Sequence, residues 1–144
     1  MTTEISDENR ESIEWLSQMG LKPSELKARI ETLDISADAK VILLQLATKV
    51  VRIGETVVKI GQKVLELVFK FTSSYPNTTF GVVFGAIAGT LISSIPIIGF
   101  VLGPLVSPIL LLLGIALGAK TDFVEKAMEA RIKSSLEPFN ALKA

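Results

Sequence analysis

The side chains that most often carry catalysis are scarce in this sequence. It contains no cysteine and no histidine, which excludes disulfides, thiolate or imidazole metal sites, catalytic cysteines and histidine-based triads. The Walker A, GxGxxG and HExxH motifs have no match. Carboxylate pairs such as Glu11 with Glu14 and Glu125 with Glu129 have helical spacing and are expected on solvated helix faces. We therefore expect no enzymatic activity, cofactor, metal or small-molecule substrate.

Glycine spacing is the more distinctive chemical pattern. Gly81, Gly85 and Gly89 follow one another at intervals of four residues, and the same interval recurs twice further along the uncharged part of the chain. On a helix this interval places small residues on one face, where another helix can approach closely. Two more glycines lie a heptad apart before this stretch. The residues expected in helix packing or homo-oligomerisation are Gly54, Gly61, Gly81, Gly85, Gly89, Gly99, Gly103, Gly114 and Gly118.

The longest feature of the chain is an uncharged run from Phe71 to Ala119, bounded by Lys70 and Lys120. One bilayer crossing takes about 20 apolar residues as a helix. The densest part, from Phe80 onward, is therefore long enough for two crossings. This pattern predicts a hydrophobic helical hairpin that a membrane or an oligomer buries.

The turn of this hairpin is expected between Ser93 and Pro104, with arms at Phe80–Ser94 and Leu105–Ala119. Serine hydroxyls in and beside the turn are expected to bind carbonyls that the prolines leave without a donor. Proline and glycine end or kink helices. The turn residues predicted on this basis are Pro96, Gly99, Gly103, Pro104 and Pro108.

Two short helices are expected before residue 35. Asp7 or Ser6 can cap the first helix, which runs through Met19, and Pro23 fits the first position of a second helix ending at Leu33. Residues 1–38 have a net charge of −5. We interpret residues 1–35 as an acidic helical pair that could recruit a protein partner.

A single long amphipathic helix is predicted over residues 36–73, with Ser36 as its N-cap. Apolar residues from Leu43 to Phe71 alternate steps of three and four, the spacing of a heptad seam. The apolar arc is broad, which suits a helix packed on two neighbours or one lying on a membrane. Residues 39–78 have a net charge of +4. The side chains expected to contact anionic lipid headgroups are Lys49, Arg52, Lys59, Lys63, Lys70 and Lys120.

The expected fold is therefore all-α and forms one structural unit. Residues 74–120 hold the glycine-zipper hairpin, and residues 121–144 hold a C-terminal amphipathic helix and tail. The first 20 residues are acidic and polar, so we expect no signal peptide. Basic residues flank both ends of the hairpin, which predicts a membrane protein with both termini in the cytoplasm. No nucleic-acid partner is expected, because exposed aromatic residues do not interleave the basic ones.

Three functions are compatible with these features. The first is a membrane-inserting, self-associating hairpin protein that permeabilises or remodels a bilayer. The second is a membrane-anchored structural or adaptor protein that recruits a partner through its N-terminal helices. The third is a soluble, all-helical oligomer with the hairpin as its core. A net negative front that shields the basic helix until a trigger releases it would be compatible with the first function.

The plan of Phe80 to Ala119 resembles that of pore-forming colicin domains and other small helical toxins, which carry an uncharged helical hairpin among amphipathic helices. The chain departs from the colicin plan because it is shorter and an amphipathic helix follows the hairpin. The resemblance is one of general plan and assigns the chain to no family; it accompanies the first function.

Overall fold

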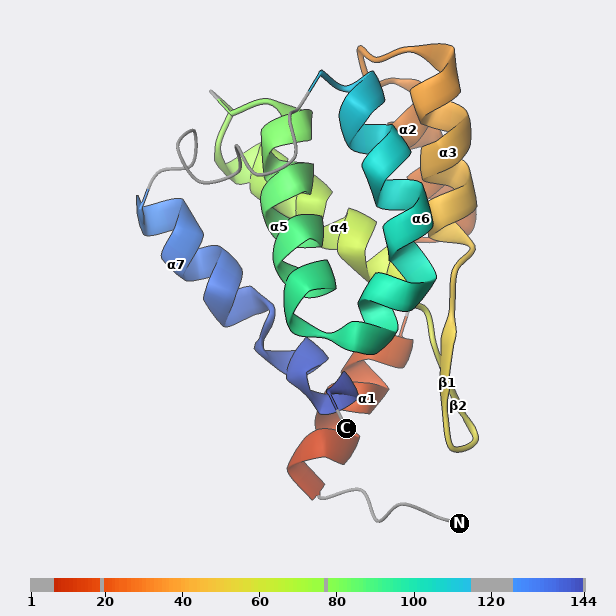
Figure 1. Cartoon of the computed structure of the whole chain (residues 1–144), viewed down its shortest axis with the longest axis vertical. Coiled ribbons are helices and arrows are strands. Elements are labelled where there is room, and N and C mark those ends of the chain that lie inside the picture. Colours follow the sequence, from red (N-terminus) through yellow and green to blue (C-terminus); the bar gives the residue numbers. More distant parts are fainter. Residues whose placement is uncertain (1–6, 19, 77, 115–125, 144) are drawn as a thin grey trace.

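The computed structural model describes residues 7–18, 20–76, 78–114 and 126–143 of the 144-residue chain. This part is mostly helical, as the sequence predicts, and it also contains one two-stranded antiparallel hairpin, which was not predicted. The predicted all-α class is therefore wrong in this detail. Figure 1 shows the helices gathered around α4, with the β-hairpin extending from one side.

The N-terminal helical pair forms as α1 (Asp7–Ser17) and α2 (Pro23–Glu31). Pro23 occupies the start of α2, as predicted, because proline needs no N–H there and its fixed φ suits a helix. Glu25 in the first turn and Arg29 in the last turn complement the helix dipole. Leu26 and Ile30 are the buried residues that face the core.

The predicted long helix over residues 36–73 is wrong. Its first part is α3 (Ala37–Ala47), its last part is α4 (Ile60–Ser74), and the hairpin β1 (Val51–Ile53) and β2 (Thr56–Val58) lies between them. The N-cap prediction is confirmed, since the Ser36 hydroxyl accepts a hydrogen bond from the Ala39 N–H at 3.1 Å.

The β-hairpin has a local cause. Residues 50–58 are rich in β-branched side chains, which favour strands. Gly54 has a φ of +60°, while no non-glycine residue of the described chain has a positive φ. Glycine at the first of two central positions is the arrangement of a type II′ turn, whose twist matches that of paired strands. The register then pairs Val51 with Val58, and both side chains are buried.

Helix α4 forms the centre of the molecule. It packs against α1, α3 and α5, and its buried residues lie on nearly every side. This agrees with one of the two arrangements that the broad apolar arc suits, a helix packed against neighbouring helices. A chain of rings, Phe69–Phe80–Phe84, with centroid distances of 5.5 and 5.9 Å, joins α4 to the next helix, α5 (Phe80–Ser94). The aromatic rings thereby fix α5 along α4.

The hydrophobic hairpin forms as α5 and α6 (Pro96–Leu112). The bounds of the first arm agree with the prediction, and Thr79 caps α5 by accepting the Val82 N–H at 3.3 Å. The predicted long turn is wrong, because only Ile95 separates the two helices. Pro96 begins α6, which suits proline, and the other predicted turn residues (Gly99, Gly103, Pro104 and Pro108) all lie inside that helix. No helix of the described chain is both long enough and apolar enough to span a bilayer.

The C-terminal segment forms α7 (Lys126–Ser135) and a 3₁₀ turn, η1 (Glu137–Leu142). The first residues of the predicted segment 121–144, up to residue 125, lie outside the described residues. η1 packs against α1, where the rings of Phe139 and Trp15 meet edge to face at 6.5 Å. The two ends of the described chain therefore lie together at one side of the bundle (Figure 1).

Candidate membrane-interacting surface

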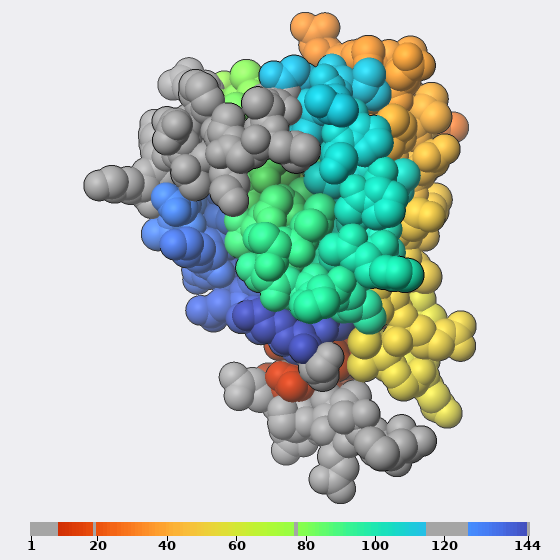
Figure 2. All heavy atoms as spheres, in the orientation of Figure 1, coloured from red at the N-terminus to blue at the C-terminus, as the bar shows by residue number. Residues whose placement is uncertain are grey.

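The α5–α6 hairpin has one protein-facing side and one outer side. On α6 the buried residues Ile98, Leu102, Val106 and Ile109 point toward the core, and α6 packs against α3 and α5. Figure 2 shows α5 and α6 next to each other across one face of the molecule. Because the sequence from 71 to 119 contains no ionisable side chain apart from Tyr75, neither side of the hairpin carries a charge.

One row of α6 residues is exposed along most of the length of the helix. We call it the α6 stripe, and it consists of Pro96, Phe100, Pro104, Ser107 and Leu111. Phe100 is 86% exposed and Leu111 is 70% exposed, the highest values among the large apolar residues of the described chain. Contiguous exposed apolar surface of this kind marks sites where proteins contact partners or membranes.

The two prolines inside α6, Pro104 and Pro108, change the backbone of the stripe. A helical N–H normally donates to the carbonyl four residues earlier, and proline has no N–H. Pro104 therefore leaves the Phe100 carbonyl without this donor, and Pro108 does the same for the Pro104 carbonyl. Both carbonyls belong to residues of the stripe, so the apolar surface contains two backbone acceptors.

The serines of the hairpin do not serve the role predicted for them. Ser93 donates to the carbonyls of Gly89 and Thr90 at 2.9 and 3.1 Å, which belong to its own helix α5. Ser107 lies on the stripe, and its hydroxyl makes no hydrogen bond within the part of the chain that the structure describes. The stripe thus has one free hydroxyl donor as well as the two acceptors.

The predicted glycine row of α5 is divided between core and surface. Gly81 and Gly85 are buried. Gly89 is half-buried, and a Cβ atom placed on it would have no heavy atom within 4 Å. Gly103 of α6 is equally open. Gly89 and Gly103 therefore leave space that another helix could fill, and whether a second copy does so remains a prediction.

The other predicted packing glycines have different roles in this structure. Gly54 forms the β-turn and has open space around it, so the predicted pairing of Gly54 with Gly61 on one helix edge is wrong. A Cβ atom placed on Gly99 would lie 3.0 Å from the Ile92 carbonyl oxygen, so this glycine allows the close α5–α6 corner. Gly114 follows the end of α6 and has a φ of +77°. Gly118 lies outside the described residues.

Gly61 allows a close contact between two helices. A Cβ atom here would overlap the Leu46 carbonyl oxygen and lie 2.9 Å from the Leu46 carbonyl carbon. The Gly61 N–H donates to the Lys49 carbonyl at 3.1 Å. The end of α3 and the start of α4 therefore meet backbone to backbone at this glycine.

The predicted lipid-contacting cations do not form one face. Lys49 is exposed just before β1, Arg52 is exposed within β1, and Lys70 is exposed near the other end of α4. Lys59 is half-buried, and Lys120 lies outside the described residues. The break between α3 and α4 separates residues that a continuous helix would have aligned. Contact of these side chains with lipid remains a prediction.

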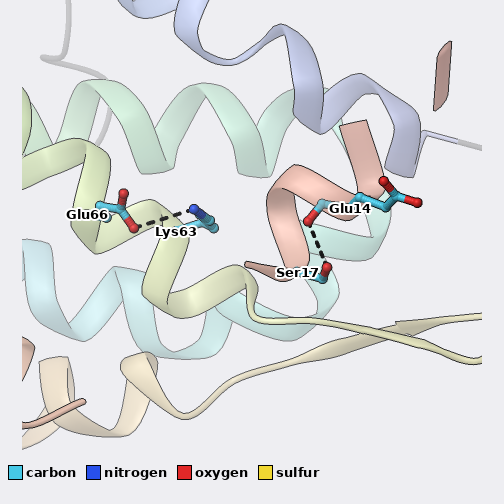
Figure 3. Close-up of polar contacts among 4 residues, drawn as sticks. All are labelled: Glu14, Ser17, Lys63 and Glu66. Atoms are coloured by element: carbon cyan, nitrogen blue, oxygen red, sulfur yellow. Dashed lines mark hydrogen bonds and ion pairs between the residues drawn. The ribbon is translucent and has the colours of Figure 1, made fainter. Parts of the chain in front are cut away.

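Lys63 is the only charged residue among the buried side chains of the described chain, at 4% exposure. Its Nζ lies 4.5 Å from the centroid of the Trp15 ring and 3.5 Å from Glu66 Oε2. Figure 3 shows Lys63 and Glu66 on α4, next to the α1 turn in which the Ser17 hydroxyl donates to the Glu14 carbonyl at 2.8 Å. The ring and the carboxylate offset the cost of burying the ammonium group, and the contact with the Trp15 ring links α1 to α4.

This cluster was not predicted, because Lys63 was expected on the basic face of a longer helix, in contact with lipid headgroups; its burial makes that contact wrong for this structure. The available signal was the apolar arc of residues 60–71, which is so broad that little of α4 remains for solvent. A second feature that was missed is a pocket of about 380 Å³ between α2, α3 and α4. Its lining is mainly apolar and includes Gln62, whose buried Oε1 has no hydrogen-bond partner within the described residues. No cluster of three metal-ligating side chains occurs in the described ranges.

Comparison of the chain with protein-family models, curated proteins and solved structures finds no match. The functional interpretation therefore depends on the residues and geometry of this molecule alone.

Proposed function

We propose that this protein is a non-enzymatic, membrane-inserting protein whose α5–α6 hairpin self-associates and permeabilises or remodels a bilayer. The observation that carries the proposal is the uncharged outer side of the hairpin, with Phe100 and Leu111 largely exposed. A protein that stayed in water as a monomer would gain nothing from displaying these two side chains. A bilayer offers an apolar phase for them without requiring any charge to be buried.

The stripe alone supports only a weak first contact. Full burial of a Phe or Leu side chain is worth about 1.5–3 kcal/mol, so Phe100 and Leu111 together would supply about 3–6 kcal/mol. A binding free energy of about 4 kcal/mol corresponds to a millimolar dissociation constant. Exposed cations such as Lys49, Arg52 and Lys70 would add about 1 kcal/mol each where they reach anionic headgroups. The proposal therefore includes a preference for anionic lipid.

Insertion would exchange protein neighbours for lipid on the core side of the hairpin. The buried α6 residues are aliphatic, so acyl chains can replace α3 as their surroundings. The uncharged sequence continues past α6 to Ala119, and a helix from Pro96 to Ala119 would exceed the roughly 20 residues that one crossing needs. Basic residues before and after the hairpin would keep both termini on the cytoplasmic side.

Vesicles loaded with a self-quenched dye test this proposal. We expect the full chain at micromolar concentration to release dye, and to do so more from vesicles that contain anionic lipid. F100S/L111S should weaken vesicle binding, since it removes the two exposed anchors. Val41, on α3, is the next most exposed large apolar residue of the described chain at 53%, so V41S is a control on another element. The proposal fails if the wild type neither sediments with vesicles nor releases dye from either lipid composition.

A second candidate is a water-soluble oligomer that covers the α6 stripe with protein. It is favoured by the core side of the hairpin, which already packs against α3 as part of the protein interior. Sedimentation of the cellular protein after an alkaline carbonate wash separates the two. An integral membrane protein should pellet, whereas the oligomer should stay in the supernatant.

A further inference from the structure

The α6 stripe combines two kinds of surface. Its side chains are apolar apart from Ser107, while its backbone offers the Phe100 and Pro104 carbonyls without their i+4 donors. In water these oxygens can accept bonds from solvent. Within the hydrocarbon of a bilayer, each backbone group without a partner costs several kcal/mol. Acyl chains are therefore a poor final neighbour for this face of α6.

The opposite face of α6 has the reverse character. Ile98, Leu102 and Ile109 are aliphatic residues, and proline does not interrupt the i+4 donors to their carbonyls. This face could meet acyl chains without leaving a backbone group unpaired. The two faces thus differ in the neighbours that they can accept inside a membrane.

We infer that the α6 stripe is the surface through which two copies of this chain meet. Its partial charges are self-complementary, because the free Ser107 hydroxyl is a donor and the Phe100 and Pro104 carbonyls are acceptors. Two hairpins that insert from the same side cross the bilayer in the same direction, so their α6 helices pair in parallel about a two-fold axis along the bilayer normal. In such a pair the Ser107 hydroxyl of each copy lies less than one helical turn along the axis from the Pro104 carbonyl of the other, so each copy is donor and acceptor at once, as an isologous contact requires. Gly103 lies beside the stripe, and a Cβ atom placed on it would have no heavy atom within 4 Å, so the backbones can approach closely.

This inference deepens the self-association part of the proposed function and rests on it for the membrane setting. It assigns the stripe to the protein–protein contact and the former core side of α6 to lipid. Phe100 and Leu111 then make the first contact at the headgroup level, where the two carbonyls remain hydrated. The partner copy covers both the two side chains and the two carbonyls once the hairpin is inside the bilayer.

Cross-linking tests the pairing, since the chain contains no cysteine and single-cysteine variants are unambiguous. S107C places a thiol on the stripe. L112C is the matched control, because Leu112 is 42% exposed on the same helix but about 100° away from the stripe. Each variant is bound to anionic vesicles and treated with a bismaleimide of short spacer. We expect S107C to lose most of its monomer band to a covalent dimer, and L112C to keep its monomer band.

The outcomes distinguish the inference from the proposed function. If the vesicles leak but S107C stays monomeric, or if L112C cross-links equally well, the pairing is wrong and the proposed function stands. If S107C cross-links in solution while no vesicle leaks, the pairing stands and the membrane function fails. Labelling of S107C by a lipid-phase thiol reagent instead of cross-linking would assign the stripe to acyl chains and overturn the inference.

Discussion

Replacement of Gly61 by alanine should destabilise the fold, although alanine is the better helix former. The added Cβ would overlap the Leu46 carbonyl oxygen, a backbone atom that cannot rotate aside as a side chain would. The adjacent Gly61 N–H donates to the Lys49 carbonyl at 3.1 Å, and a shift of α4 would lengthen this bond. The junction of α3 and α4 therefore has little freedom to relax.

The size of the effect follows from two opposing contributions. Alanine is favoured over glycine within a helix by about 1 kcal/mol at most, and Gly61 lies in the first turn of α4, where the gain is smaller. Overpacking of a close contact typically costs about 1–3 kcal/mol or more, and loss of the Lys49 bond would add about 1 kcal/mol. We expect G61A to lower the free energy of unfolding by about 2 kcal/mol, measured by urea unfolding with the fluorescence of the single tryptophan, Trp15.

Gly89 provides the matched control for this substitution. It lies inside α5, and a Cβ atom at this position would have no heavy atom within 4 Å. G89A should therefore raise the free energy of unfolding by up to about 1 kcal/mol. If Gly89 packs against a second copy in the membrane, G89A should also reduce dye release even though the fold is more stable. A G61A protein as stable as the wild type, or a G89A protein less stable than it, would refute the packing argument.

Two further substitutions test the cluster on α4 and the turn of the β-hairpin. K63A should lower the free energy of unfolding by about 1–3 kcal/mol, because it removes the packed stem, the contact with Trp15 and the pair with Glu66. K63M keeps the stem and should lose less, so equal urea midpoints for all three proteins would contradict the assigned role. G54A should cost about 1–2 kcal/mol, since alanine rarely adopts a positive φ, and G54N should cost less. Faster amide exchange at Val58 in G54A but not in G54N would report this strain, and identical exchange would speak against it.

Local signals in the sequence were sufficient for several boundaries. Ser36 caps α3, Pro23 begins α2, and α5 has the predicted bounds from Phe80 to Ser94. Each of these depends on a residue whose backbone preference decides the outcome within one helical turn. The uncharged composition of the hairpin likewise predicted its two packed helices.

The predicted long helix over residues 36–73 is wrong because hydrophobic periodicity cannot distinguish a helix from two short strands within this stretch. Valine and isoleucine at positions 50–58 satisfy a heptad seam, and they are also the residues that strands favour. Gly54 decides between the two structures, since it supplies the positive φ of the turn. Tertiary contacts of β2 with α1 then stabilise the hairpin, and no local pattern encodes them.

The predicted turn of the hydrophobic hairpin extends too far along the chain, because proline commonly ends or kinks helices but does not end α6. Pro96 begins α6, and Pro104 and Pro108 lie inside it on or beside the exposed stripe. The outer side of a helix can hydrate the carbonyls that proline leaves without a donor, so the cost of proline is smaller there than in a core. Prolines are therefore tolerated on the side of α6 that faces outward. Only the tertiary structure defines which side that is.

The two sides of α6 also constrain how one hairpin could serve both a folded protein and a membrane. The core side already contributes Ile98, Leu102 and Ile109 to the interior, so insertion must separate these residues from α3. The stripe is exposed without any such separation, so its contact with a bilayer costs no core packing. The order of events in the proposed function follows from this difference: contact through Phe100 and Leu111 comes first, and release of the core side comes second.

Gly61 bears on the second step, because it joins α4 to α3, the helix from which α6 must separate, and no residue of the stripe belongs to this junction. G61A loosens the α3–α4 junction. We expect this protein to bind vesicles as the wild type does and to release dye faster. Vesicle sedimentation and the time course of dye release, measured on the same samples, separate the two steps. Weaker sedimentation of G61A would contradict this order, since it would mean that the first contact already depends on the α3–α4 junction.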